Sequence, residues 1–479
     1  MVTDLFDVAI LGAGPAGAAA AIEASRCRLN AILIDEQASA GGQVYRCAPG
    51  IDAAHADPDR EEGNALREAL SDADIERKFG YRVWHVEKAE AGFRLHALGP
   101  EGPVTITTKA LVVATGALER YVPFLGWEQP GVMGLASATV LLKAQQMLPG
   151  RNVVVAGAGP LLYAVAKGIV EGGGQVAAVV DAQPRRAWWR HARELASRPD
   201  LVKRGYSWMR VLRSAGVTVL HRYALHSVVA YGRELRAIIA PIAADGSPQS
   251  GLTRYHVNCD AVCCGYGLMP DTYVTRLLGA AHVYDASLGG WHVVVDEDQR
   301  CDVPGLYAAG DGAGVVGAAA APNQGRVAVL SIARDLRRLN DREFAWHAAA
   351  DKRVRARAAR FGKVMTQIAR IGDGAIATLP PDVTMCVCER VQKATLETAI
   401  GDGCATINDL KRATRCGMGP CGGRLCEDAV ARLVALKTSR SRAAIGQSTA
   451  RPPLRPVGLD AIAGTFDYDA LPMPVPAPL

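Results

Sequence analysis

The stretch that decides the fold is Val8-Ala9-Ile10-Leu11-Gly12-Ala13-Gly14-Pro15-Ala16-Gly17. Its four apolar residues predict a buried strand, and its three glycines have the spacing GxGxxG before a run of alanines that predicts a helix. Glycine permits the tight turn and the close approach of backbone N–H groups to a pyrophosphate, which the helix N-terminus then faces. A second apolar strand, residues 31–34, ends at Asp35, where an acid typically binds ribose hydroxyls. The stretch therefore predicts a dinucleotide-binding α/β unit.

Composition limits the class of protein around this unit. The chain has 479 residues, of which 49% are hydrophobic and 21% charged, as in globular proteins with several domains. A net charge of +6 is small for this length and does not favour a nucleic-acid partner. Apolar runs stay below the ~18 residues of a membrane span, and the N-terminus lacks the basic region of a signal peptide. We therefore expect a cytoplasmic protein without a membrane span.

A second nucleotide-binding unit is predicted from residue 153 onward. Its strand leads into Gly157-Ala158-Gly159-Pro160-Leu161-Leu162, so Leu162 stands where the first unit has a glycine. That position packs helix against strand, and a leucine should separate them or re-aim the helix. The next strand ends at Asp181, whose charge disfavours the 2′-phosphate of NADPH. We expect a remnant of the fold or a site for another adenine nucleotide, in preference to a nicotinamide site.

Three further segments are predicted to return to the first unit. Gly41-Gly42 predicts a loop that closes over the cofactor, and the strand 111–114 ends in small residues that allow a second backbone approach. The strand 306–309 ends in Gly310-Asp311, whose carboxylate can accept hydrogen bonds from a polyol chain. A helix predicted from residue 326 can direct its N-terminus at a flavin carbonyl.

Residues 184–213 combine several tryptophans with many arginines. This composition is found in nucleic-acid and membrane-surface segments, but also in amphipathic insertions that pack on a partner or a neighbouring domain. We favour the packing interpretation, because the rest of the chain carries no basic stripe.

Six of the twelve cysteines lie between residues 386 and 426, namely Cys386, Cys388, Cys404, Cys416, Cys421 and Cys426. In a cytosolic-looking enzyme such crowding indicates a metal or a cluster, and not a disulfide framework. Four thiolates at the ends of a short helical unit can bind an iron–sulfur cluster or a zinc ion. The C-x-C start is unusual for structural zinc, and glycines around Cys421 offer N–H groups to bridging sulfides.

The chain as a whole resembles a known family. Residues 12–17, Ala114-Thr115-Gly116 and Gly310-Asp311 are similar to the glutathione and thioredoxin reductase architecture, and the cysteine-rich part resembles the bacterioferritin-associated ferredoxin (BFD) type of 2Fe–2S module. With residues 41–46 and 415–421, the combination resembles the alpha (A) subunits of opine oxidases. It is close to the B-type component of hydrogen cyanide synthase and to the alpha subunits of dye-linked proline and hydroxyproline dehydrogenases.

The resemblance implies an α/β fold with two Rossmann-like dinucleotide-binding domains and a small helical BFD-like domain. The implied boundaries are 1–120 and 286–345 for the FAD-binding domain, 121–285 for the second, NAD-like domain, 346–380 for a linker, 381–435 for the 2Fe–2S domain and 436–479 for an extended tail.

It also implies a division of labour in a hetero-oligomer. A separate beta subunit, similar to D-amino-acid and sarcosine oxidases, oxidises the substrate C–N bond on its own FAD. The present chain binds FAD and a 2Fe–2S cluster and relays the electrons, and no catalytic base is assigned to it. The resemblance leaves room for an FMN at the subunit border and for a small third subunit.

The site residues carried over by the resemblance fall into two sets. Those for FAD are Gly12, Gly14, Pro15, Ala16, Asp35, Glu36, Gly42, Gln43, Arg46, Thr115, Gly116, Gly310 and Asp311. Those for the cluster are Cys386, Cys388, Cys421 and Cys426, with Cys416 as the alternative in the second pair. The spacing Cys421-x4-Cys426 departs from the C-x2-C of the ferredoxin module, so the second pair stays open.

Two other functions remain as alternatives. The first is a free-standing NAD(P)H-dependent reductase that feeds its own cluster, against which Leu162 and Asp181 speak. The second is a scaffold with a vestigial fold, against which the clustered cysteines speak. A disulfide reductase is not indicated, because Cys47 stands alone and Cys263-Cys264 read as buried core thiols.

Overall fold

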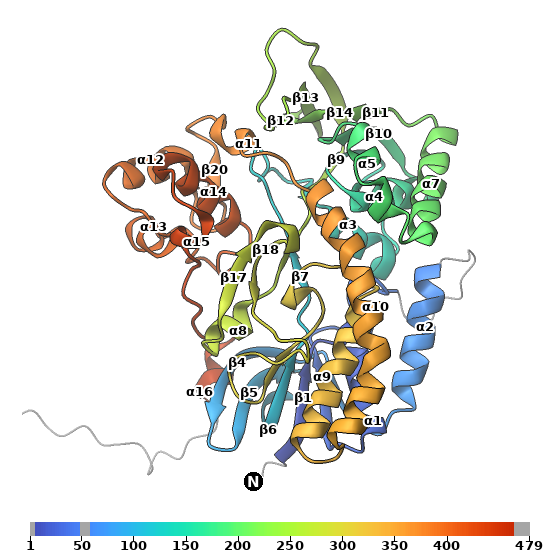
Figure 1. The fold of residues 1–479 in the computed structure, drawn as a ribbon. Coiled ribbons are helices and arrows are strands. Elements are labelled where there is room, and N and C mark those ends of the chain that lie inside the picture. The colour runs from blue at the N-terminus through green and yellow to red at the C-terminus, as the bar shows by residue number, and fades with distance from the viewer. Residues whose placement is uncertain (1–4, 48–57, 464–479) are drawn as a thin grey trace, which may run out of the picture.

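The opening stretch forms the centre of the largest sheet (Figure 1). In this computed structural model, which describes residues 5–47 and 58–463, β1 (Leu5–Leu11) pairs in parallel with β2 (Ala31–Asp35) and β6 (Gly102–Val113). The order is β3-β2-β1-β6-β5-β4, and β19 (Leu306–Ala308) pairs in parallel with β6. The remaining strands are β3 (Glu76–Phe79), β4 (Arg82–Ala89) and β5 (Gly92–Gly99).

Small residues let helices pack closely on one face of this sheet. The alanines of α1 (Pro15–Arg26) are buried, and α9 (Ala321–Asp335) approaches so closely that a Cβ at Gly325 would lie 2.0 Å from the carbonyl oxygen of Ala16. The long helix α10 (Asp341–Ile368) runs beside α9, and α2 (Pro58–Ser71) lies next to α1 (Figure 1).

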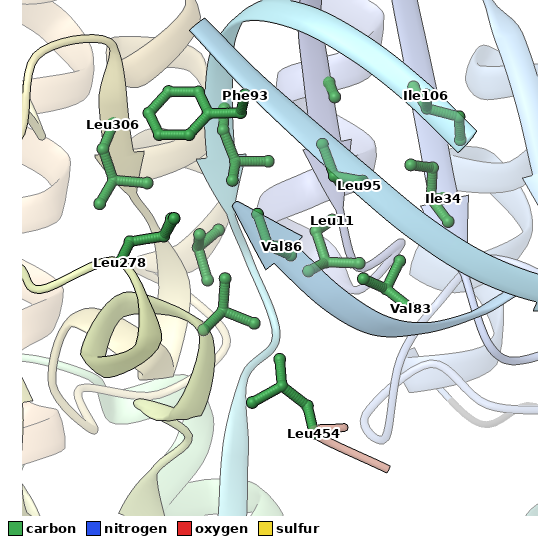
Figure 2. Packing of buried hydrophobic residues seen from close by; sticks show 14 of the residues in the cluster. Leu11, Ile34, Val83, Val86, Phe93, Leu95, Ile106, Leu278, Leu306 and Leu454 are labelled. Carbon is green, nitrogen blue, oxygen red and sulfur yellow. The ribbon is translucent and has the colours of Figure 1, made fainter. Parts of the chain in front are cut away.

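The opposite face carries a core of larger side chains (Figure 2). Alternation along β1 places Val8 and Ile10 toward the helices and Leu11 toward this second core. Phe93 and Leu95 are fully buried there, and Leu454 of the C-terminal segment packs against the same cluster. The C-terminal segment is thus built into the first unit as far as the structure describes it.

A second, parallel sheet repeats the pattern with the order β11-β10-β9-β15-β8. Its strands are β8 (Val132–Gly134), β9 (Asn152–Gly157), β10 (Gln175–Asp181), β11 (Val219–His221) and β15 (Ala261–Gly265). Its helices are α3 (Leu135–Val140) with the π-helix η1 (Leu141–Gln145), α4 (Pro160–Glu171) and α7 (Pro199–Ser214). An antiparallel sheet of β12 (Tyr223–Tyr231), β13 (Glu234–Pro241) and β14 (Tyr255–Cys259) adjoins it. The two predicted nucleotide-binding folds are confirmed.

The segment 184–213 packs on this second unit. It forms α5 (Arg186–Trp189), α6 (Ala192–Leu195) and α7. Leu212 is fully buried against the second core, and Trp188 and Trp208 are partly buried against it. The packing interpretation of this segment is therefore borne out by the structure, and the predicted core thiols Cys263 and Cys264 are likewise buried.

Short strands link the two units. The chain crosses through β7 (Ala117–Glu119) and returns through β16 (Leu268–Pro270), and these two strands pair antiparallel. The return continues through α8 (Tyr273–Leu277), the hairpin of β17 (His282–Asp285) and β18 (Gly290–Val293), with η2 (Ala286–Leu288) between them, and then η3 (Gly310–Ala313).

The range 346–380, expected as a linker, contains most of α10. A capping box of Asn340 and Glu343 starts this helix, and a proline-free run rich in alanine and arginine continues it to Ile368. The expectation rested on basic charge, which a solvent-facing helix also carries.

The cysteine-rich part is a small helical unit beside the link (Figure 1). Its elements are α11 (Gly374–Ala377), β20 (Thr384–Cys386), β21 (Val391–Gln392), α12 (Lys393–Gly401), α13 (Ile407–Thr414), α14 (Glu427–Thr438) and α15 (Arg442–Ile445). Residues after it lead to α16 (Leu459–Ala463) near β4.

Candidate functional site

The glycine turn after β1 leaves space that only glycine provides. Gly12 has φ +104°, and a Cβ there would lie 2.4 Å from the carbonyl oxygen of Ala114. A Cβ at Gly17 would lie 1.7 Å from the carbonyl oxygen of Gly12, so the first turn of α1 sits directly on the loop. Pro15 occupies the first position of α1, where its missing N–H costs no hydrogen bond. The backbone N–H groups at the N-terminus of α1 are therefore next to this turn, where a phosphate can approach them.

Asp35 lies at the end of β2, beside this turn. Its Oδ2 accepts a hydrogen bond from the backbone N–H of Ala13 at 2.5 Å, and its Oδ1 accepts one from Gln37 at 2.7 Å. Burial raises the pKa of Asp35, although these two backbone donors act in the opposite direction. Each carboxylate oxygen keeps a second lone pair for a hydroxyl donor.

Glu36, the next residue, lies close to two arginines. Its carboxylate lies 3.9 Å from the guanidinium of Arg82 and 3.7 Å from that of Arg455. Asp35 thus hydrogen-bonds directly to the glycine turn, whereas the contacts found for Glu36 among the described residues are with the two arginines.

The loop after β2 covers the turn. The backbone N–H of Gly41 donates to the carbonyl of Ala13 at 2.8 Å, and a Cβ at Gly42 would lie 2.8 Å from Cα of Gly14. Arg46 donates to the carbonyl of Gly42 at 3.4 Å, whereas Gln43 is exposed.

The other predicted FAD residues lie at the ends of β6 and β19. Gly310 donates its N–H to Oε1 of Gln324 at 2.9 Å, and Asp311 Oδ1 accepts from the N–H groups of Val316 and Gly317, each at 3.1 Å. Burial raises the pKa of Asp311. Gln324 was not singled out from the sequence, because α9 begins at Ala321 and not at residue 326 as predicted, which brings Gln324 into its first turn.

The second unit keeps the helix start but differs in its turn. Helix α4 still begins at Pro160, but Gly159 has φ +88° where Gly14 has φ −69°. Leu162 is fully buried in the core, and a Cβ at Gly159 would lie 2.7 Å from the Cβ of Ala369, so the end of α10 abuts the turn. The change at Leu162 is accompanied by a different turn and not by loss of the helix.

Asp181, the acid at the end of β10, already hydrogen-bonds to other residues of the protein. Asp181 is 1% exposed; its Oδ2 accepts from the hydroxyl of Tyr163 at 2.6 Å and lies 3.5 Å from Nδ1 of His221. Oδ1 accepts the N–H of Gln183 at 2.9 Å, and the Gln183 amide donates to the carbonyl of Arg370 at 2.6 Å. The second unit therefore uses its acid for internal contacts.

Three of the six clustered cysteines form one tight group, and two others, Cys388 and Cys421, lie beside each other. The sulfurs of Cys386, Cys416 and Cys426 all lie within 4.8 Å of one another, and those of Cys416 and Cys426 are 4.0 Å apart. The latter two thiols lower the pKa of Cys386 by donating to its sulfur. Burial raises the pKa of Cys388, and the neighbouring Cys421 thiol adds to this effect.

Glycines lie between the cysteines of this loop for a steric reason. A Cβ at Gly419 would lie 2.2 Å from the Cβ of Cys388, so only glycine lets the two cysteine-bearing segments meet. Cys404, the sixth cysteine, does not belong to the group of three within the described residues. The geometry offers a thiolate-rich site of the kind that soft metal centres prefer.

Buried ion pairs fix the cysteine unit to the link between the two nucleotide folds. Arg120, 3% exposed, lies 3.2 Å from Asp428, two residues after Cys426, and Arg442 lies 2.8 Å from the same carboxylate. Arg276 lies 3.2 Å from Glu427. These residues were missed from the sequence, since a charged side chain is normally read as a solvated one.

Hydrogen bonds connect the segment after β6 (Thr115-Gly116, here called the FAD-type loop) with the loop 416–426 (the cysteine loop) through residues 271–273. Thr115 donates to the carbonyl of Asp271 at 3.3 Å, and the N–H of Asp271 donates to the carbonyl of Gly116 at 3.0 Å. Tyr273, two residues further on, donates its hydroxyl to the carbonyl of Gly422 at 2.9 Å. The guanidinium of Arg424 stacks over the Tyr273 ring.

A cavity of about 1490 Å³ lies between the two nucleotide folds. Asp311 and the following residues border it from the first unit, and Leu135 and α7 border it from the second. Glu119, at the end of β7, also lines it.

Family models match both parts of the chain. Residues 6–334 match pyridine nucleotide-disulphide oxidoreductase, and residues 384–465 match the sarcosine oxidase A3 domain. The chain is 32% identical to the A-type component of opine oxidase from Agrobacterium tumefaciens (strain Ach5), covering 96% of this chain and 92% of that one. It is 29% identical to the HcnB component of hydrogen cyanide synthase from Pseudomonas protegens, covering 94% and 96%.

Among solved structures, L-proline dehydrogenase from P. horikoshii has a TM-score of 0.70 at 20% identity, covering 96% of this chain and 80% of that one. At this identity the likeness concerns the fold. Within the described residues, none of the helices is long and apolar enough to cross a membrane.

Proposed function

Because the chain belongs to the family of the opine oxidase alpha (A) subunits, on the fold of the pyridine nucleotide-disulphide oxidoreductases, we propose that it is the electron-transfer subunit of a hetero-oligomeric, flavin-dependent amino-acid dehydrogenase. The oxidoreductase fold implies that the chain binds FAD. The substrate is an N-substituted or cyclic amino acid, such as an opine, proline or hydroxyproline, and its C–N bond is oxidised on another subunit.

The FAD of this proposal lies on the first unit. The turn at Gly12, Gly14 and Pro15 and the N-terminus of α1 bind the pyrophosphate, and Asp35 binds the ribose hydroxyls. The ribityl chain is bound by Asp311. The fit rests on the space that the missing Cβ atoms leave and on the free lone pairs of the Asp35 carboxylate. When bound, FAD supplies two-electron redox chemistry.

The cluster of this proposal is a 2Fe–2S centre, which supplies one-electron chemistry. Cys386, Cys388, Cys421 and Cys426 are its ligands, and Cys416 is the alternative to one of the second pair. The fit rests on five thiols within one loop system, three of them mutually within 4.8 Å.

The observation that carries the proposal is the attachment of the cysteine unit to the FAD-type loop. Thr115, Asp271 and Tyr273 connect that loop to Gly422, next to Cys421, by hydrogen bonds. Such a bonded path supports electron exchange between a flavin and a cluster. No pair of cysteines with a disulfide-reductase spacing lines the first unit among the described residues, which supports electron relay over thiol chemistry.

The partners belong to the same proposal. A beta subunit similar to D-amino-acid and sarcosine oxidases carries the substrate site, with an FMN at the border and a small third subunit as optional components. The second nucleotide fold is a remnant or a site for an adenine nucleotide. Cytoplasmic location completes the proposal.

The test is to express the chain with and without a candidate beta-subunit flavoprotein from the same organism. We expect the chain alone to bind one FAD and a 2Fe–2S cluster, visible by absorbance and by electron paramagnetic resonance after reduction. Substrate should reduce both centres only when the partner is present. Rapid bleaching of the isolated chain by NADH would instead establish the free-standing reductase, and turnover of an amino acid by the isolated chain would overturn the division of labour.

A further inference from the structure

The segment 186–213 is buried on one side and exposed on the other. Leu212 packs into the second core, whereas Trp189, on the short helix α5, is 80% exposed. On α7, Val202 and Tyr206 are exposed by 45% and 67% and lie about one helical turn apart. Several large apolar side chains exposed in one segment indicate an interaction surface.

Helix α10 extends this surface. The helix contacts α6, and its later part lies beside the second unit (Figure 1). Trp189 and Ala192 of the α5–α6 region border the same cavity as Ala358 and Phe361 of α10. Val354, one turn before Ala358, is 51% exposed. Helices α5 and α6 and the later part of α10 therefore form one continuous face.

Six exposed arginines give this face its charge. They are Arg186, Arg190 and Arg193 in the region of α5 and α6, and Arg353, Arg357 and Arg360 on α10. The latter three have the spacing i, i+4 and i+7, so they lie on one side of the helix. Glu194 is the one acid in residues 186–195, and residues 353–368 contain none. We call these six arginines together with Trp189 the arginine face.

The charge of the arginine face is not neutralised by the part of the chain that the structure describes. Within that part none of the six guanidinium groups forms an ion pair, in contrast to Arg204 on α7 and Lys352 on α10. Crowded like charges repel one another, and a partner that carries carboxylates removes this repulsion. The arginine face therefore fits an acidic surface.

The composition of the arginine face favours a protein over a lipid bilayer. Guanidinium groups bind carboxylates in a bidentate manner and stack on aromatic rings, and arginine and tryptophan are enriched in protein interfaces. An amphipathic helix binds a bilayer through its apolar side. On α7 that side, with Trp208 and Leu212, packs on the second core and is not free for lipid.

We propose that the arginine face is the docking surface for the substrate-oxidising beta subunit, whose complementary surface carries carboxylates, and that Trp189 is its aromatic anchor. The proposal rests on the proposed function, because that function supplies the partner. Trp189 borders the same cavity as Asp311, the residue proposed to bind the ribityl chain. A partner on this face therefore lies on the side of the molecule where the flavin end of FAD is proposed.

Two variants change the arginine face without altering the core. Arg353→Glu/Arg357→Glu reverses two charges, and Trp189→Ser removes the anchor; all three side chains are exposed. The matched control is Arg412→Glu/Arg440→Glu, which makes the same change of net charge at two exposed arginines of the cysteine unit. Thermal unfolding and the FAD and cluster content of each purified protein are compared with the wild type, so that a folding defect is recognised.

The Kd for a candidate beta-subunit flavoprotein from the same organism is measured by surface plasmon resonance at several salt concentrations. We expect Arg353→Glu/Arg357→Glu to bind about tenfold more weakly, mainly through slower association, and with a flatter salt dependence than the wild type. Trp189→Ser should bind about thirtyfold more weakly, mainly through faster dissociation. The control should stay within about threefold of the wild type.

The outcomes separate this proposal from the proposed function. A complex that forms with unchanged Kd in both face variants would overturn the docking surface and leave the proposed function standing. An equal loss in the control would show that binding follows the total charge, which also overturns the docking surface. No complex with the wild type would be the failure of the proposed hetero-oligomer, and the docking surface would fall with it.

A lipid surface is the competing occupant, and it has its own measurement. The assembled complex is sedimented with vesicles of phosphatidylglycerol and phosphatidylcholine in equal parts. We expect no binding, because the beta subunit covers the arginine face. Binding that is lost in Trp189→Ser would assign the face to a membrane and refute the proposal.

Discussion

The two nucleotide folds of this protein start from the same ten-residue pattern, an apolar strand followed by Gly-Ala-Gly-Pro, and differ in the contacts that follow it. In the first, Gly17 lets α1 rest on the turn, and the Asp35 carboxylate keeps lone pairs for a ligand. In the second, Leu162 fills the core, and the Asp181 carboxylate is closed by Tyr163. The comparison shows that a repeated fold can keep its strand, turn and helix while the acid that would bind a ligand hydrogen-bonds to the protein itself.

The second unit has gained another role in exchange. Residues from its turn and strand ends, including Ala158, Ala182 and Tyr266, share one buried cluster with Cys386 and Cys426. The second unit thus serves as a platform for the cysteine unit, while the ligand is assigned to the first unit by the proposed function.

The largest effect, loss of FAD, is expected when Gly17 of the first unit is replaced by leucine, the residue at the corresponding position 162 of the second unit. In Gly17→Leu the new Cβ would stand 1.7 Å from the Gly12 carbonyl, so we expect the purified protein to contain no FAD. The matched variant Leu162→Ala should keep its FAD and lose about 2–5 kcal/mol of unfolding free energy through the cavity it leaves. Flavin absorbance and chemical denaturation measure the two results. Retention of FAD by Gly17→Leu would remove the basis of the comparison.

The platform role is tested at Asp428. Asp428→Asn leaves the buried Arg120 without its anionic partner, which should cost about 3–5 kcal/mol in unfolding free energy. Arg412→Ala is the control, since Arg412 is an exposed side chain of the same unit. Thermal unfolding with cluster absorbance as the probe should show the loss, and equal melting of both variants would mean that the unit docks by its apolar contacts alone.

The same pair predicts a pH dependence. Burial alone would raise the pKa of Asp428, but Arg120, Arg442 and Arg432 together hold it below its ordinary range. A lowered carboxyl pKa stabilises the folded state above about pH 4, where the unfolded chain is ionised, and this contribution is lost as the pH falls below 4. The wild type should therefore lose its advantage over Asp428→Asn in acid.

A smaller effect on FAD affinity should distinguish Asp35 from Asp181. Asp35→Asn removes a charged acceptor of the ribose hydroxyls and should weaken FAD binding by about 1.5–3 kcal/mol, roughly 10- to 150-fold in Kd. Asp181→Asn should leave FAD affinity unchanged. Fluorescence titration of the apoprotein with FAD measures both, and a similar loss in the two variants would contradict the assignment of FAD to the first unit.

The smallest effect is expected at Tyr163. Tyr163→Phe removes the hydroxyl that donates to Asp181 at 2.6 Å and should cost about 1–2 kcal/mol of stability. FAD content and electron transfer should not change. A gain of nucleotide affinity in this variant, read by calorimetry with ATP, would show that the second site is merely closed and not lost.

Much of this architecture could be predicted from local patterns. The strand–glycine–helix stretches define both nucleotide folds, since glycine spacing and apolar runs act over a few residues. The resemblance to the alpha subunits of opine oxidases is confirmed by the identity over nearly the whole chain. The cysteine spacing predicted a cluster region, in which the structure groups Cys386, Cys416 and Cys426 and places Cys388 beside Cys421. The choice among Cys416, Cys421 and Cys426 as ligands stays a prediction.

The remainder depends on contacts between distant segments. Nothing near Arg120 in the sequence indicates that it pairs with Asp428, more than 300 positions later. Glu36 and Asp35 are neighbours with the same charge, and the sequence does not show that Asp35 hydrogen-bonds to Ala13 while Arg455 from the C-terminal segment approaches Glu36. The length of α10 was obscured because its basic residues resemble a linker.

The insertion of Leu454 into the core of the first unit has a consequence for how electrons travel. Its N–H donates to the carbonyl of Trp84 at 2.6 Å, and its carbonyl accepts from Arg424 in the cysteine loop at 3.1 Å. The cysteine unit is therefore tethered on both sides, by α10 before it and by this segment after it. A domain held at two ends cannot shuttle between donor and acceptor, so the rate of exchange is set by a fixed tunnelling distance and should be insensitive to solvent viscosity.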